Sequence, residues 1–78
     1  MSKVKIYSTP RCGYCHSEKE FLKENGIEFE DFNVFSDLKA REEMISKTGQ
    51  MGVPVTDIDG QIIIGFDRGK IKKLLNIK

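Results

Sequence analysis

The sequence has no apolar run long enough to cross a bilayer and no large excess of charge of either sign. A membrane-spanning helix needs about 20 apolar residues, and no stretch of this chain approaches that length. The formal net charge is +1 over 78 residues, so there is no electrostatic case for binding nucleic acid or an anionic membrane. Residues 1–6 contain no apolar core before a small-residue cleavage site, so secretion is not indicated and we expect a cytoplasmic protein.

Cysteine is also scarce, because the chain has only Cys12 and Cys15. A small secreted protein that depends on disulfides spreads more of them along its chain. A ring as short as the one between these two residues stabilises a fold by roughly 2 kcal/mol on loop-entropy grounds. The pair is therefore better explained by chemistry than by scaffolding. The length accommodates one compact domain, residues 1–78, with a modest core.

The residue pattern predicts an α/β fold with the element order β-α-β-α-β-β-α. Alternating apolar and polar residues indicate strands, and apolar residues spaced three and four apart indicate helices. A strand–helix–strand opening implies parallel pairing through a right-handed crossover, and Asp59-Gly60 indicates a two-residue hairpin. The charged runs 18–20 and 39–43 are expected on solvent-facing sides of helices. The predicted elements are a strand at 4–7, a helix at 14–24, a strand at 27–34, a helix from a cap at Ser36 or Asp37 to about Thr48, strands at 55–58 and 61–64, and a helix at 69–77.

Cys12 is expected at the end of a strand-to-helix turn, with Cys15 on the same face of the first helical turn. Free backbone N–H groups and the positive end of the helix dipole then point at the Cys12 sulfur and favour its thiolate. The positive charge of Arg11 acts in the same direction. We therefore predict that Cys12 is the exposed nucleophile and Cys15 the resolving thiol. Tyr14 offers an aromatic surface beside them, although a simple packing role fits it equally well.

Three motifs, in this order and at these spacings, resemble the glutaredoxins. They are Cys12-Gly13-Tyr14-Cys15 after the first strand, Val53-Pro54 before the third, and Gly65-Phe66-Asp67 before the last helix. The resemblance covers residues 3–75 and is strongest for short bacterial glutaredoxin-like proteins, which include electron donors for ribonucleotide reductase. It implies a thioredoxin fold, in which a four-stranded mixed sheet is flanked by helices, and a cis peptide bond before Pro54. It also implies a monomeric thiol–disulfide oxidoreductase that reduces protein disulfides or glutathione mixed disulfides.

The resemblance further implies a substrate or glutathione site with no bound cofactor or metal. Electrons would come from glutathione or from a flavoprotein thioredoxin reductase, so the partners are glutathione, disulfide-containing proteins and an upstream reductase. Thr9 stands where the family has its glutathione-binding lysine, and Ile63-Ile64 where relatives served by thioredoxin reductase carry tryptophan and serine, so the electron source stays open. The residues implied for the site are Arg11, Tyr14, Val53, Pro54, Gly65, Phe66 and Asp67.

The cysteine pair also fits other kinds of site. Residues 12–16 satisfy the C-x-x-C-H pattern of covalent haem attachment, and Cys12, Cys15 and His16 are possible zinc ligands. Haem attachment requires an exported protein and structural zinc requires a second ligand cluster, and the sequence indicates neither. Two alternatives stay open: a dimer that shares an iron–sulfur cluster through Cys12 and glutathione, and a non-catalytic module that binds partners along Val53-Pro54.

Overall fold

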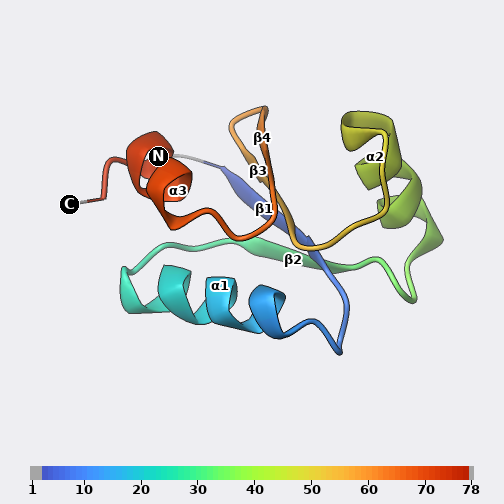
Figure 1. Ribbon diagram of the computed structural model, residues 1–78, viewed down its shortest axis with the longest axis horizontal. Coiled ribbons are helices and arrows are strands. Elements are labelled where there is room, and N and C mark those ends of the chain that lie inside the picture. The colour runs from blue at the N-terminus through green and yellow to red at the C-terminus, as the bar shows by residue number, and fades with distance from the viewer. Residues whose placement is uncertain (1–2, 78) are drawn as a thin grey trace.

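The computed structural model describes residues 3–77 and has the predicted order of strands and helices (Figure 1). None of the helices in this part of the chain is long and apolar enough to cross a membrane. The elements are β1 (Val4–Ser8), α1 (Gly13–Glu24), β2 (Glu30–Asn33), α2 (Leu38–Thr48), β3 (Val55–Ile58), β4 (Gln61–Ile64) and α3 (Arg68–Leu75).

The strands form one mixed sheet in the order β2-β1-β3-β4. β1 pairs in parallel with β2 and antiparallel with β3, and β3 pairs antiparallel with β4. The β3–β4 hairpin turns at Asp59-Gly60, where both residues have positive φ angles of 52° and 91°. This is the turn chemistry expected of such a pair, because a tight two-residue hairpin of type I′ needs left-handed conformations at both positions. The predicted thioredoxin-like fold is confirmed.

Alternate residues of β1 contribute to two apolar clusters, one on each face of the sheet. Val4 and Ile6 join a cluster that includes Leu22 of α1 and Ile71 of α3. Tyr7 joins a second cluster that includes Met44 of α2. The period-two alternation of a strand thus places α1 and α3 against one face and α2 against the other.

Polar contacts attach α2 to its face of the sheet as well. The buried Tyr7 hydroxyl donates a hydrogen bond to Glu43 and accepts one from Lys47 at 3.0 Å. The Lys47 ammonium also lies 2.7 Å from the Asp57 carboxylate of β3. α2 begins at Asp37, one of the two predicted caps, whose side chain accepts a hydrogen bond from the Ala40 N–H.

Two predicted boundaries are wrong by a few residues. β2 begins at Glu30, not Ile27, because the Ile27 N–H still bonds the Leu22 carbonyl of α1 at 2.9 Å and the first parallel pair is Lys5 with Glu30. Ile27 and Phe29 are half-buried against the α1–α3 cluster without joining the sheet. α3 ends at Leu75 rather than Ile77, since Asn76 is left-handed, with φ 57°.

Replacing Met44 by alanine should test the packing of α2. Met44 is fully buried, so we expect the free energy of unfolding to fall by about 2–5 kcal/mol, measured by urea denaturation of the oxidised protein. Met51 is 64% exposed and provides a matched control, for which Met51→Ala should change stability by less than about 0.5 kcal/mol. Equal losses in the two variants would contradict this packing.

Candidate active site

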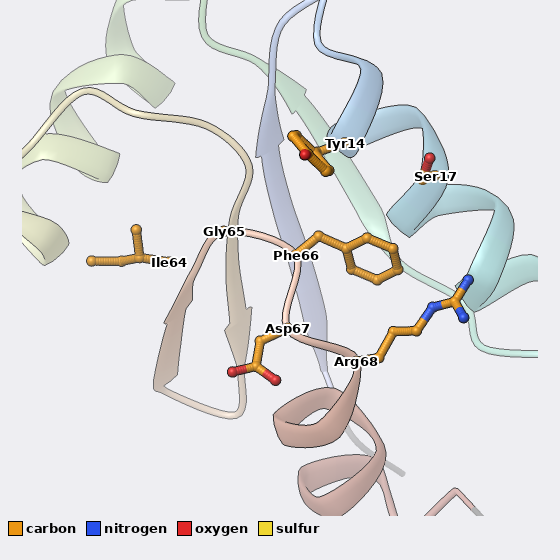
Figure 2. Close-up of a pocket in the computed structure, with 7 residues that line it drawn as sticks. All are labelled: Tyr14, Ser17, Ile64, Gly65, Phe66, Asp67 and Arg68. Carbon is orange, nitrogen blue, oxygen red and sulfur yellow. The ribbon is translucent and has the colours of Figure 1, made fainter.

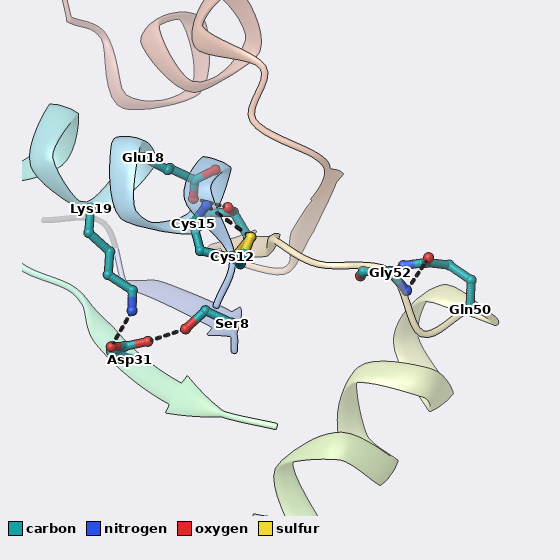
Figure 3. Close-up of a disulfide and its surroundings, with 9 residues drawn as sticks. Ser8, Cys12, Cys15, Glu18, Lys19, Asp31, Gln50 and Gly52 are labelled. Carbon is teal, nitrogen blue, oxygen red and sulfur yellow. Dashed lines mark hydrogen bonds and ion pairs between the residues drawn. A yellow bond between two sulfur atoms is a disulfide. The ribbon is translucent and has the colours of Figure 1, made fainter. Parts of the chain in front are cut away.

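The two cysteines form a disulfide at the head of α1 (Figure 3). Cys12 is the N-cap residue of the helix, and its sulfur accepts a hydrogen bond from the Cys15 N–H at 3.1 Å. The Cα atoms of the two residues are 5.2 Å apart. The structure therefore places the Cys12 sulfur within hydrogen-bonding distance of a first-turn N–H group at the positive end of a helix, as the sequence predicted.

The two sulfur-bearing residues differ in their access to solvent. Cys12 is half-buried, whereas Cys15 is only 1% exposed and lies beneath the turn. Tyr14 between them is 74% exposed. A large disulfide partner can therefore approach the first cysteine but not the second.

The loop before β3 carries the cis peptide bond that the resemblance implied, between Val53 and Pro54. The Pro54 carbonyl accepts a hydrogen bond from the Gly65 N–H at 2.8 Å, which joins this loop to the segment that follows β4. Gln50 closes the other end of the loop by bonding both the N–H and the carbonyl of Gly52 (Figure 3). The bond between Pro54 and Gly65 thus joins the Val53-Pro54 motif to the Gly65-Phe66-Asp67 motif.

A groove lies between α1 and the segment that leads into α3 (Figure 2). Four residues of the predicted site line it together: Tyr14 from α1 and Gly65, Phe66 and Asp67 from the segment after β4. Val53 and Pro54 are not among its lining residues. Arg11 lies in a separate hollow with Thr9, Pro10 and Phe35. The predicted site residues therefore divide between this groove, the cis-proline loop and the outer side of the Cys12 turn.

Arg68 is a residue of the groove that the sequence analysis missed. Its guanidinium carbon lies 5.3 Å from the ring centroid of Phe21 and 5.5 Å from that of Phe66. The available signal was its position directly after the Gly65-Phe66-Asp67 motif. The preceding Asp67 uses one carboxylate oxygen to cap α3, accepting from the Lys70 N–H at 3.1 Å, so the groove carries a cation beside a helix N-terminus.

Glu18 corrects the expectation that residues 18–20 face solvent. Its side chain is fully buried, and one carboxyl oxygen accepts a hydrogen bond from the Thr56 hydroxyl of β3. The other carboxyl oxygen has no hydrogen-bond partner among the described residues. Burial raises the pKa of Glu18 from 4.5 to about 7, against the opposing effect of the Thr56 hydrogen bond. The helical period explains the error, because position 18 lies on the same face as Cys15 and Leu22.

The next residue, Lys19, is also drawn towards the sheet. Its ammonium lies 2.7 Å from the Asp31 carboxylate, which accepts a hydrogen bond from the Ser8 hydroxyl at 2.8 Å (Figure 3). His16 is exposed on the first turn of the helix. Within residues 3–77, no three His, Cys, Asp or Glu side chains gather as metal ligands.

A glutaredoxin family model matches residues 4–63. A glutaredoxin-like 8.6 kDa protein encoded in a rubredoxin operon of Clostridium pasteurianum is 54% identical, over 92% of this chain and 96% of that protein. Glutaredoxin 3 of Escherichia coli K12 is 39% identical, over 86% of this chain and 81% of that protein. The structure of the glutaredoxin-like NrdH-redoxin from E. coli superimposes with a TM-score of 0.83 at 28% identity, covering 92% and 93% of the two chains.

The mixed sheet, the disulfide at a helix N-terminus and the neighbouring cis-proline loop define a thioredoxin-like redoxin. Within that class, the chain belongs to the glutaredoxin family. It is a thiol–disulfide oxidoreductase with a C-x-x-C active site.

The buried carboxyl group predicts a pH-dependent stability. The folded protein binds the Glu18 proton more tightly than the unfolded chain does, since burial raises the pKa of this group to about 7. The unfolded state therefore carries fewer protons between about pH 4.5 and 7, and the free energy of unfolding falls as the pH rises through that window. The contribution of Glu18 to the free energy of unfolding is greatest below about pH 4.5 and is lower by about 3 kcal/mol at pH 7.

The free energy of unfolding of the oxidised wild-type and Glu18→Gln proteins should be measured by urea denaturation at several pH values. The difference between the two proteins isolates the contribution of Glu18. We expect Glu18→Gln to gain stability relative to wild type as the pH rises, because an amide does not ionise. Glu20→Gln is the matched control, since Glu20 is exposed two positions along the same helix. A constant stability difference across this range would show that Glu18 does not titrate there.

Proposed function

We propose that Cys12 attacks the disulfide of a substrate and that Cys15 then resolves the mixed disulfide. In the first step a bond forms between the Cys12 sulfur and one substrate sulfur, and the other substrate sulfur leaves as a thiolate. In the second step Cys15 attacks the Cys12 sulfur, closes the intramolecular disulfide and expels the reduced substrate. Two electrons pass to the substrate, and the protein is left oxidised.

The observation that carries this assignment is the hydrogen bond from the Cys15 N–H to the Cys12 sulfur, at 3.1 Å. Such a contact stabilises a thiolate at this sulfur, and the thiolate is the nucleophile in disulfide exchange. The difference in exposure supports the same order, because Cys15 is 1% exposed and cannot meet a bulky substrate first.

We propose glutathione as one ligand of the groove beside Tyr14. This tripeptide carries two carboxylates and one amino group, so its net charge is negative at neutral pH. Arg68 supplies a positive charge in the groove, and Phe66 with Tyr14 supplies apolar surface. The N-terminus of α3 favours a carboxylate as well, while Asp67 is suited to the amino group.

Glutathione is therefore the proposed source of electrons. The family position of a glutathione-binding lysine is Thr9 here, so Arg68 would be the principal cation of the glutathione site. Thioredoxin reductase is the alternative donor, and one observation favours it: the E. coli NrdH-redoxin, which shares this fold, is described as having a thioredoxin-like activity profile.

Protein disulfides are the second proposed substrate class, and a reductase such as ribonucleotide reductase would be one example. Three large apolar side chains from the segments around the disulfide are strongly exposed: Tyr14 at 74%, Met51 at 64% and Ile64 at 57%. Exposed apolar residues around a reactive group provide contact area for a polypeptide, whose burial is favourable on binding.

A turnover assay with glutathione and glutathione reductase, run beside one with thioredoxin reductase, tests the function and its electron source. We expect Cys12→Ser to abolish turnover on every substrate. Cys15→Ser should still form a stable mixed disulfide with glutathione, detectable by mass spectrometry, but should lose turnover on protein disulfides. If Cys12→Ser kept its activity, or if neither donor reduced the wild-type disulfide, the proposal would be wrong.

Arg68→Ala tests the glutathione groove. Loss of a charged hydrogen-bonding partner typically costs about 1.5–3 kcal/mol, so we expect the KM for glutathione to rise about 10-fold or more with little change in kcat. Lys72→Ala is the control, because Lys72 is an exposed cation of the same helix outside the groove. An equal effect of the two substitutions would point to general charge rather than to a site.

A further inference from the structure

Among residues 3–77, Glu18 has the buried ionisable side chain near the disulfide that the dithiol mechanism does not use. One oxygen accepts the Thr56 hydroxyl hydrogen bond, and the other has no partner among the described residues. Removing a carboxyl group from water without a full set of hydrogen bonds is costly. A valine or leucine would fill this position of the helix with less free energy lost, so the carboxyl group needs another explanation.

The position of the Glu18 carboxyl group on α1 supplies an explanation. Glu18 follows Cys15 by three residues on α1, so both side chains lie on the same face of the helix. The two residues are 0% and 1% exposed. Figure 3 shows the Glu18 carboxyl group turned towards the end of the helix that holds the disulfide. The carboxyl group and the thiol that the reduced protein would contain are therefore both shielded from bulk water on one face of α1.

Over residues 3–77, the other charged or titratable groups around α1 do not contact the Glu18 carboxyl group. Lys19 is paired with Asp31 of β2, and His16 is exposed. β3 contributes the Thr56 hydroxyl to the Glu18 side of the sheet. Among the charged or titratable groups on the neighbouring elements, Lys5, Tyr7 and Asp57 lie on the opposite face of the sheet. Arg68 lies over the rings of Phe21 and Phe66, Asp67 caps α3, and Arg11 is exposed beside Cys12.

A buried thiol needs a proton acceptor if it is to attack. Burial in apolar surroundings disfavours the thiolate. Within the described part of the chain, the Cys15 sulfur accepts no hydrogen bond like the one that the Cys12 sulfur accepts from a helix N–H. The most effective acceptor is a group that titrates near the working pH. The pKa of Glu18, raised by burial to about 7, meets that condition.

We propose that Glu18 accepts the proton of Cys15 during resolution and returns it during reduction. When Cys15 attacks the Cys12 mixed disulfide, a sulfur–sulfur bond forms between the two cysteines, the bond from Cys12 to the substrate breaks, and the substrate leaves as a thiolate. The Cys15 proton passes to the unpartnered Glu18 oxygen, directly or through one water. When a donor thiolate later attacks Cys12, Cys15 leaves and takes that proton back. The proposal rests on Cys15 acting as the resolving thiol.

A chromogenic aromatic disulfide separates the two steps without reference to the natural substrate. Mixing it with the reduced protein should release one aromatic thiolate when Cys12 attacks and a second when Cys15 closes the ring. We expect Glu18→Gln to leave the rate of the first release unchanged. The second release should slow about 10-fold to 100-fold at pH 7, at or below the lower end of what a positioned proton-transfer group contributes.

The pH profile distinguishes proton transfer from a structural effect. In the wild-type protein the second rate should rise with an inflection near the pKa of Glu18, whereas Glu18→Gln should lack this inflection and approach the wild-type rate at high pH. A purely structural defect would slow the reaction by the same factor at every pH. Thr56→Val keeps the carboxyl group but removes its hydrogen bond, so the inflection should move to higher pH.

Each failure has a different meaning. If the second release is as fast in Glu18→Gln as in wild type, with the same pH profile, the role of Glu18 is refuted while the dithiol mechanism stands. If Cys15→Ser still gives two releases, the resolving role of Cys15 itself is wrong. Glu20→Gln should leave both phases unchanged, since this exposed carboxylate lies on the solvent side of the helix.

Discussion

The hydrogen bond from the Cys15 N–H to the Cys12 sulfur is the contact on which the rest of the site depends. It exists because a strand ends at Ser8 and a helix begins at Gly13, with Cys12 as the cap. A cap position normally takes an oxygen-bearing side chain that accepts one of the free N–H groups. Here a sulfur occupies that position, so in the proposed mechanism the helix stabilises negative charge on the nucleophile instead of on a structural oxygen.

The remaining elements bring the other parts of the site to this sulfur. The Cys12 turn follows the carboxyl end of β1, a central strand of the sheet. The antiparallel partner of β1, β3, begins directly after the cis-proline loop. The bond between Pro54 and Gly65 then joins that loop to the groove. Two motifs that are far apart in the sequence are therefore hydrogen-bonded to each other, and the groove takes Tyr14 from α1 and Arg68 from α3 (Figure 2).

The order of elements and the place of the cysteine pair could be predicted because both depend on local signals. Strand alternation, the Asp59-Gly60 turn and the cap at Asp37 are each encoded within a few residues. The start of β2 could not be predicted in this way, since Ile27 and Phe29 are apolar for packing against helices and not for pairing. The cation of the groove was missed because a lone arginine in a basic segment does not differ from its neighbours.

Glu18 shows most clearly what the residue pattern alone does not determine, namely which face of a helix is buried. Its neighbours Lys19 and Glu20 suggest a solvated helix face, whereas the spacing from Cys15 to Glu18 to Leu22 places it on the buried face. Both patterns are present in the sequence, and only the packing of α1 against β3 decides between them. A buried acid reduces stability at neutral pH, which is the kind of local conflict expected where function rather than folding selects a residue.

The most direct test of the account is the ionisation of Cys12 in the reduced Cys15→Ser variant, which keeps the backbone N–H and removes the second thiol. Thiolate absorbance should be followed as the pH is raised. We predict a midpoint clearly below about pH 8.5, the value of an ordinary cysteine, because the helix N-terminus stabilises the anion. A midpoint at or above that value would contradict the account, since the sulfur would then gain nothing from its position.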